Sequence, residues 1–87
     1  MIYQGTITKL LPQRTGKRND GTTWTCQPFI FNQSVTHQET ILLETCDTDI
    51  MDKLKEGAQA HIDYYPFVHY YGGKIYNIFY IKSIVLL

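Results

Sequence analysis

The stretch ETILLETCDTDIMDKLKEGAQAHIDYY, residues 39–65, changes its hydrophobic period twice, and this change decides the fold class. Residues 39–45 are typical of a strand. Residues 47–57 then place apolar side chains on one helical face, with acids in the first turn, lysines in the last and Gly57 after the end. From residue 58 onward, apolar and polar side chains alternate again. We therefore predict a strand, a helix of roughly two to three turns and another strand.

Further strands are expected on both sides of this stretch. Residues 2–11 alternate at period two and end at a proline. A polar connection with an Asp-Gly turn signal follows over residues 13–23 and is expected to be a mobile hairpin tip. Residues 24–32 form the second strand, in which Pro28 indicates an edge position, a bulge or a sharp bend. Residues 74–87 form the last strand, after a Gly-Gly turn.

Five strands with one helix between the third and the fourth is the chain order of the OB-fold, a partly open Greek-key barrel. We therefore predict an all-β fold with one short helix, β-β-β-α-β-β, that occupies residues 1–87 as a single domain. An SH3-like barrel is the alternative, although it rarely places a helix there. The positions expected to point inward are Phe29, Phe31, Phe79 and Ile81. The adjacent Tyr64 and Tyr65 are expected to point to opposite faces, with one of them in the core.

These same segments carry a resemblance to a known family. Residues 41–65 resemble the part of bacterial-type single-stranded DNA-binding proteins that runs from the third strand through the helix into the fourth. The whole chain is similar to short single-domain OB-fold proteins of bacteria and phages, in which strands like GTITKLLP and W...QPFIF and a hairpin like YYGGKIYNI recur. The resemblance implies single-stranded DNA as the ligand. The family usually carries a glycine-rich tail with an acidic tip that recruits partners, and because this sequence ends at IVLL, such recruitment is not expected.

Charge and hydrophobicity narrow the class of protein. The 87 residues hold eight Lys and Arg against eight Asp and Glu, so the net charge of zero gives no bulk attraction to a polyanion. Basic residues predominate over residues 1–38 and acidic residues over residues 39–56. The sequence has neither a long apolar block nor a positively charged start before one. We expect a cytoplasmic protein of a bacterial cell or a phage-infected host, without a membrane segment.

Cysteine and histidine give no sign of a metal site. Cys26 and Cys46 lie symmetrically about a predicted turn and could face each other across two strands. In a reducing compartment we expect two thiols rather than a disulfide. His37, His61 and His69 share no face and no ligand spacing with other candidates, so we predict no metal and no cofactor.

The candidate binding site comes from the two loops that flank the ligand face of an OB-fold, between strands one and two and between strands four and five. Here these are residues 13–23 and 67–76, which combine cations with aromatic rings, as single-stranded nucleic acid requires for its phosphates and bases. The candidate residues are Arg14, Lys17, Arg18, Trp24, Tyr65, His69, Tyr70, Tyr71, Lys74 and Tyr76. The alternatives are aromatic pairs that only stiffen a hairpin, a Trp24 that plugs the barrel end, and cations that are merely solvated.

Two functions of different classes fit these residues. The first is sequence-tolerant binding of single-stranded DNA in replication or recombination, by a homodimer or homotetramer, with salt-sensitive affinity. The second is a protein-interaction or assembly module whose tyrosine-rich hairpin forms the interface. RNA as the ligand is not separated from DNA. We expect no enzyme and no small-molecule substrate, because the sequence pairs no nucleophile with a base and has no phosphate-cradling glycine loop.

Overall fold

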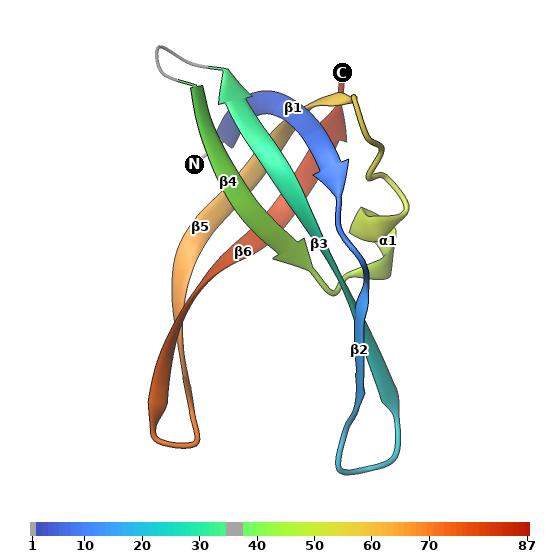
Figure 1. Cartoon of the computed structure of the whole chain (residues 1–87), viewed down its shortest axis with the longest axis vertical. Helices are drawn as coiled ribbons and strands as arrows, with labels where there is room; N and C mark the ends of the chain where they lie inside the picture. Colours follow the sequence, from blue (N-terminus) through green and yellow to red (C-terminus); the bar gives the residue numbers. More distant parts are fainter. Residues whose placement is uncertain (1, 35–37) are drawn as a thin grey trace.

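The computed structural model describes residues 2–34 and 38–87 and folds them almost entirely into antiparallel strands (Figure 1). The elements are β1 (Ile2–Leu10), β2 (Arg14–Lys17), β3 (Thr23–Ser34), β4 (Gln38–Thr45), α1 (Thr48–Met51), β5 (Gln59–Tyr71) and β6 (Lys74–Leu86). The predicted all-β fold with one short helix is confirmed.

The strands pair in the order β4-β3-β1-β5-β6, and β2 pairs with the first half of β3. Since β1 and β2 both pair with β3 and only residues 11–13 separate them, they act as one interrupted first strand. The sheet curls so that β4 and β6, at the two ends of this order, lie in contact. Five strands in this arrangement form an OB-like half-barrel, as predicted.

The core follows the period-two pattern of the central strand. Phe29 and Phe31 of β3 are completely buried, and Ile81 of β6 packs in the same cluster. Tyr64 is 4% exposed and its neighbour Tyr65 is 43% exposed, so the two rings do point to opposite faces. Phe79 was predicted to be core but is 39% exposed. It lies where β5 and β6 leave the barrel, and its ring forms a T-shaped contact with the ring of Tyr64, at a centroid distance of 5.5 Å.

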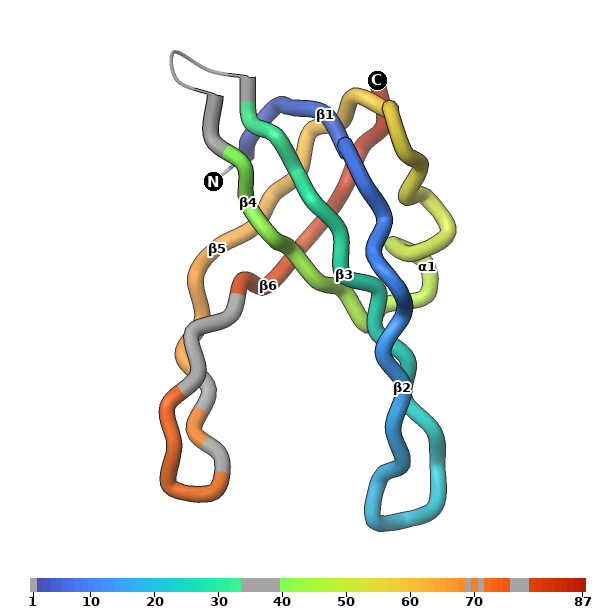
Figure 2. The backbone as a smooth tube through the Cα atoms, viewed as in Figure 1, coloured from blue at the N-terminus to red at the C-terminus, as the bar shows by residue number. Residues whose placement is uncertain are grey.

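Close backbone approach and a bulge curve the first strand around this core. A side chain at Gly5 would collide with the backbone carbonyl of Asn32 and the ring of Phe31, so β1 and β3 lie unusually near each other there. The register between the two strands shifts between Ile7 and Lys9, which is the signature of a β-bulge and of local bending. Figure 2 shows the resulting curl of the chain.

The helix is shorter than predicted. Only Thr48–Met51 is helical, and the side chain of Asp47 caps it by accepting a hydrogen bond from the backbone N–H of residue 49, at 2.9 Å. Local turns follow the helix, in which Lys53 N–H donates to Ile50 O (3.0 Å) and Leu54 N–H donates to Met51 O (3.1 Å). The chain then pairs with β1, where the N–H of Gly57 donates to Ile7 O (2.7 Å) and the N–H of Ile7 donates to Ala58 O (2.9 Å). The prediction from helical periodicity was therefore wrong in length, because the residues after Asp52 form turns that lead into this pairing.

Two hairpins project from the same end of the barrel and extend in the same direction (Figure 1). We call residues 14–26, formed by β2, its turn and the start of β3, the basic arm. Residues 64–81, formed by the second half of β5, its turn and the first half of β6, are the aromatic arm. These arms account for the elongated shape of the molecule, with principal extents of 43 × 26 × 19 Å.

Candidate nucleic-acid interface

The basic arm is a hairpin whose tip is closed by its own hydrogen bonds. The connection predicted over residues 13–23 is mostly strand, because Arg14–Lys17 pairs with residues 23–26 and only the residues between them turn. In the turn, Arg18 N–H donates to Thr22 O at 2.7 Å. Asp20 accepts from both the N–H and the hydroxyl of Thr22, and these hydrogen bonds lower the pKa of its carboxyl. The predicted hairpin tip is therefore an ordered turn.

Trp24 lies on the backbone of this arm rather than in the barrel. It stands opposite Gly16, and a Cβ at that glycine would collide with the indole ring, so the ring covers the glycine. The guanidinium of Arg14 is 6.0 Å from the centroid of the same ring, at the limit of a cation–π contact. Trp24 is half-buried and lies outside the buried core cluster of the described residues. The alternative of a barrel-end plug does not fit this position.

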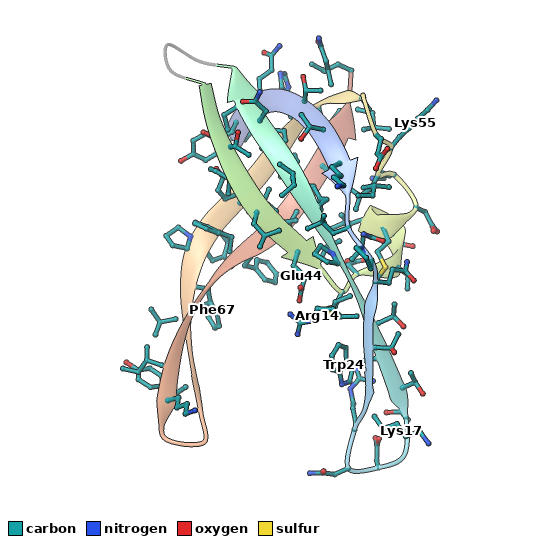
Figure 3. The ribbon with its side chains drawn as sticks, viewed as in Figure 1. Arg14, Lys17, Trp24, Glu44, Lys55 and Phe67 are labelled. Atoms are coloured by element: carbon teal, nitrogen blue, oxygen red, sulfur yellow. A yellow bond between two sulfur atoms is a disulfide. The ribbon has the colours of Figure 1, made fainter. Side chains whose placement is uncertain are left out.

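The cations of the basic arm do not converge on one surface. In Figure 3, Arg14 and Trp24 project toward the side where the aromatic arm lies, whereas Lys17 projects the opposite way. Arg18 is held in the tip, where its guanidinium donates to the Thr22 hydroxyl and to Thr23 O. The three side chains predicted to contact phosphates, those of Arg14, Lys17 and Arg18, are thus all solvent-accessible but do not point to one common surface.

Glu44 is a neighbour of this site that the sequence analysis missed. Arg14 Nη1 donates to Glu44 Oε2 at 3.2 Å, which places an acid from β4 beside the most inward cation. Both side chains are partly solvated, so the ion pair contributes little to stability, but it offsets the charge of Arg14. The signal that could have found it is the strand register: β3 and β4 pair without a register shift, which puts Glu44 opposite Pro28, two residues along β3 from the partner of Arg14.

The aromatic arm exposes large apolar side chains on both faces. Tyr65 and Tyr80 form a cross-strand pair with ring centroids 5.3 Å apart, yet both rings remain accessible. Tyr70, predicted to stack on bases, is 73% exposed, and Ile75 opposite to it is 64% exposed. Lys74 at the tip is also exposed. Since neighbouring residues of a strand point to opposite faces, the exposed Phe67 and Val68 extend this apolar character to both sides of the hairpin.

Three predicted site residues fall on this arm with side chains outside the described part of the structure. The backbone pairs His69 with Tyr76 and Tyr71 with Lys74, so all three belong to β5 or β6. Nothing further is assigned to their rings. The prediction that they contribute to stacking stays a prediction.

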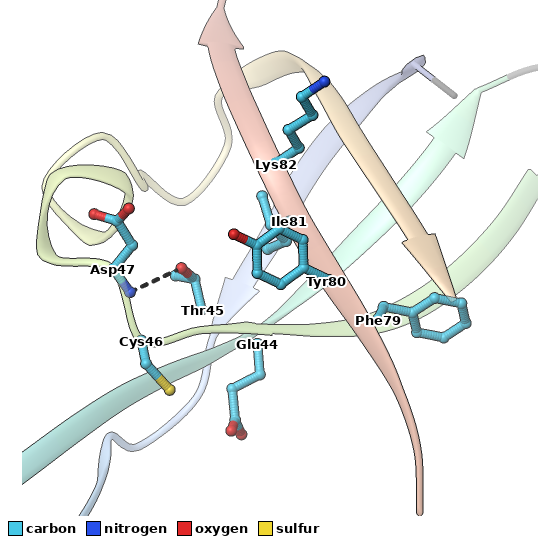
Figure 4. A pocket seen from close by; sticks show the side chains of 8 residues that line it. All are labelled: Glu44, Thr45, Cys46, Asp47, Phe79, Tyr80, Ile81 and Lys82. Atoms are coloured by element: carbon cyan, nitrogen blue, oxygen red, sulfur yellow. Dashed lines mark hydrogen bonds between the residues drawn. The ribbon is translucent and has the colours of Figure 1, made fainter. Parts of the chain in front are cut away.

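A pocket of about 290 Å³ lies between the end of β4 and β6, where the aromatic arm leaves the barrel (Figure 4). One wall is the end of β4 and the chain leading to α1, residues 44–47, and the other is residues 79–82 of β6. Tyr80 belongs both to this wall and to the ring pair of the aromatic arm. The pocket therefore lies beside the exposed rings and the disulfide that reaches the basic arm, with Glu44, Asp47 and Lys82 as the charged groups of its lining.

Cys26 and Cys46 form a disulfide that ties β3 to the end of β4. The prediction of two free thiols was wrong, because it rested on the expected compartment rather than on geometry. The symmetric placement of the two cysteines is borne out, since Gln27 pairs with Thr45 and the next opposed pair is Cys26 and Cys46, with their Cα atoms 4.1 Å apart. The disulfide lies at the foot of the basic arm, where Cys26 is also opposite Arg14.

Comparison with known proteins adds no assignment. Over the described residues, no helix has the length and apolar character needed to cross a membrane. No protein-family model, curated protein or solved structure matches this chain.

Proposed function

We propose that this protein binds single-stranded DNA without strong sequence preference. The observation that carries the proposal is the placement of Trp24, half-buried over Gly16, on the side of the basic arm that faces the exposed rings of the aromatic arm. An accessible indole and accessible tyrosines at the same end of an OB-like barrel are the groups on which unstacked bases bind.

In this proposal, stacking supplies most of the affinity. Each base stacked on an aromatic side chain contributes about 1–3 kcal/mol, whatever its identity. Phosphate neutralisation contributes less, because the net charge is zero and Arg14 is already paired with Glu44. Lys17, Arg18 and Lys74 are the exposed cations of the two arms that are available for phosphates. With few phosphate contacts, the affinity should depend only weakly on salt. A plot of log K against log salt concentration has a slope of about −0.7 for each phosphate contact to a single strand.

The biological setting that we propose is DNA replication or recombination in the cytoplasm of a bacterium or a phage-infected cell. A homodimer or homotetramer would place several pairs of arms along one strand, and such repetition compensates for the low charge of each copy. RNA remains an alternative ligand, because stacking and phosphate contacts do not distinguish it from DNA.

A protein-interaction module is the second candidate, and one observation favours it. Ile75 and Val68 are exposed on the aromatic arm beside its rings. Aliphatic side chains are poor stacking partners for bases, whereas a hairpin that is apolar on both faces fits a protein partner. The two candidate functions therefore differ in one respect: DNA binding requires only the aromatic rings of this arm, whereas a protein interface would use its aliphatic side chains too.

A charge-matched pair of double variants tests the proposal. Lys17→Ala with Arg18→Ala removes two positive charges from the basic arm, and Lys53→Ala with Lys55→Ala removes two from exposed positions near α1. Figure 3 shows Lys55 near the other end of the molecule from the hairpin tips. Binding of a labelled oligo-thymidine is measured by fluorescence anisotropy over a range of salt concentrations.

The proposal predicts that Lys17→Ala with Arg18→Ala binds the oligonucleotide more weakly, and that the slope of log K against log salt concentration becomes shallower by about 1–2. Lys53→Ala with Lys55→Ala should keep the affinity and the slope of the wild-type protein. Equal effects of the two variants would mean that the attraction is non-specific. Absence of binding by the wild-type protein at low salt would remove the nucleic-acid function and favour the protein-interaction module.

A further inference from the structure

Three metal-ligating side chains converge at the foot of the basic arm, outside the surface assigned to stacking. The Sγ atoms of Cys26 and Cys46 and a carboxylate oxygen of Glu44 all lie within 4.8 Å of one another. The first comes from β3 and the other two from the end of β4, so the sheet itself holds them together.

A tetrahedral metal ion sets the spacing that the three ligand atoms must adopt. With metal–sulfur distances of about 2.3 Å and metal–oxygen distances of about 2.0–2.2 Å, neighbouring ligand atoms lie roughly 3.6–3.8 Å apart. The two Sγ atoms are bonded to each other in the disulfide, so they must move apart to this distance after reduction, and the carboxylate oxygen needs to approach by about 1 Å at most. Rotation of the two cysteine side chains, and of the one-third exposed Glu44 side chain, allows these changes.

The chemistry of the three groups selects a zinc-like ion. Two thiolates with one carboxylate favour a borderline-soft divalent transition metal over Mg²⁺ or Ca²⁺, which prefer oxygen alone. The ligands carry three negative charges against two on the ion, and the guanidinium of Arg14, 3.2 Å from Glu44, lies beside the remaining negative charge. As an outer-shell partner it would also donate a hydrogen bond to the ligating carboxylate. The fourth position would open toward the pocket lined by Glu44 and Cys46.

We propose that the reduced protein binds one zinc-class divalent ion through Cys26, Cys46 and Glu44, and that the disulfide and this metal site are alternative states of the same three residues. A dithiol reductant opens the disulfide by transferring two electrons and two protons, and its own two sulfur atoms become joined in a disulfide. The two cysteine thiols then lose their protons when the metal binds. This proposal does not rest on the binding of DNA.

Such a site has a structural consequence for the basic arm. The disulfide clamps β3 to β4 where the arm leaves the barrel. In a reducing compartment that covalent clamp would open, and a metal held by residues of both strands replaces it. The foot of the arm, including the Arg14 and Glu44 pair, is then held in either redox state.

Cobalt binding to the full chain tests the proposal, because Co²⁺ occupies zinc sites and thiolate ligation gives it an intense near-ultraviolet charge-transfer absorption. The protein is reduced with a phosphine, stripped of metal and titrated with Co²⁺, beside the oxidised protein. The matched variants are Glu44→Gln, which removes the proposed ligand, and Asp49→Asn, which removes an exposed carboxylate outside the group of three. Cys46→Ser removes one thiolate.

The expected result is one Co²⁺ per reduced chain, with the thiolate band, and none for the oxidised protein or for Cys46→Ser. Glu44→Gln weakens Co²⁺ binding by at least about tenfold, and Asp49→Asn leaves it unchanged. Absence of the band in the reduced wild type overturns the proposal, whether the reduced chain stays folded or not. Equal affinity of Glu44→Gln and wild type overturns it too, because two thiols of an unstructured chain would then explain the binding.

Discussion

The two arms share one architecture but differ in how their side chains are used. Both are antiparallel hairpins at the same end of the barrel. In the basic arm, Arg18 and Asp20 are bonded within the turn, and Trp24 is laid on Gly16. In the aromatic arm, large apolar groups such as Tyr70 stay in water on both faces. A polar hairpin can satisfy its own groups, whereas exposed apolar groups would gain free energy if a ligand covered them. The aromatic arm should therefore carry more of the binding energy and the basic arm more of the local order.

Loss of the disulfide should have the largest effect on stability, and it should act on the basic arm. The bond closes a loop with a sequence separation of 20 residues, for which chain entropy predicts a loss of about 3 kcal/mol in the free energy of unfolding. Urea denaturation of Cys26→Ser with Cys46→Ser measures it. Wild-type protein in a metal-free reducing buffer should lose the same amount.

Hydrogen exchange locates this loss. Amides of Thr15 and Thr25, which pair within the basic arm, should exchange faster in the double variant than in wild type, relative to amides of the aromatic arm. A uniform increase over both arms would contradict the assignment of the clamp to the foot of the basic arm.

The next effect separates rings from aliphatic groups on the aromatic arm. Tyr70→Ala should weaken binding of oligo-thymidine by about 1–3 kcal/mol, because a stacking surface is lost. Ile75→Ala, directly opposite and similarly exposed, is the matched control and should change the affinity by less than about twofold. Isothermal titration calorimetry gives both values. Comparable losses would indicate a contiguous apolar interface and would favour the protein-interaction module.

A smaller effect is expected from filling the space under Trp24. In Gly16→Ala the new methyl group collides with the indole, and because this ring is only half-buried it can shift away, at a cost of about 1 kcal/mol. The free energy of unfolding should fall and tryptophan emission should shift to longer wavelength. Thr15→Ala, at an exposed neighbouring position, is the control. Unchanged emission in Gly16→Ala would show that the ring is not held against this glycine.

The smallest effect concerns the acid in the turn of the basic arm. Hydrogen bonds from Thr22 lower the pKa of Asp20 below its ordinary value of 3.8. A depressed folded-state pKa means that the contribution to stability is present above the unfolded pKa and is lost as pH falls through the folded pKa. Amide chemical shifts of Gly21 and Thr22 should therefore change below about pH 3.8, and Asp20→Asn should abolish that change. The aromatic arm should not respond through this group.

Much of the fold was predictable from local patterns, and what was missed depends on contacts between distant residues. Period two identified the strands and the buried Phe29 and Phe31, because one face of each strand must be apolar. The helix was overestimated because turns after Asp52 lead into the pairing of Gly57 and Ala58 with β1, and a local window does not contain that pairing. Phe79 was predicted to be buried but is partly exposed. The alternation of a strand indicates which face of the sheet a residue lies on, but it does not indicate where the hairpin extends beyond the barrel.

The candidate site divides in the same way. Arg14 and Trp24 were predicted from the kinds of residues that single strands need, and both lie on the basic arm. Their relation to Glu44 and to the disulfide comes from the pairing of β3 with β4, which brings residues up to 30 positions apart into contact. The symmetric positions of Cys26 and Cys46 in the sequence already indicated that the two residues could face each other. The disulfide was still not predicted, because a reducing compartment was expected.

Tryptophan emission reports directly on the proposed binding of single-stranded DNA, because Trp24 is the only tryptophan in the chain. The oxidised protein is titrated with unlabelled oligo-thymidine and with a duplex of the same length, at low and at raised salt. We expect saturable quenching by the single strand, weakened by salt, and little change with the duplex, because only unstacked bases reach the indole. Emission that stays constant with the single strand, or that responds equally to the duplex, would contradict the proposed binding of bases by Trp24.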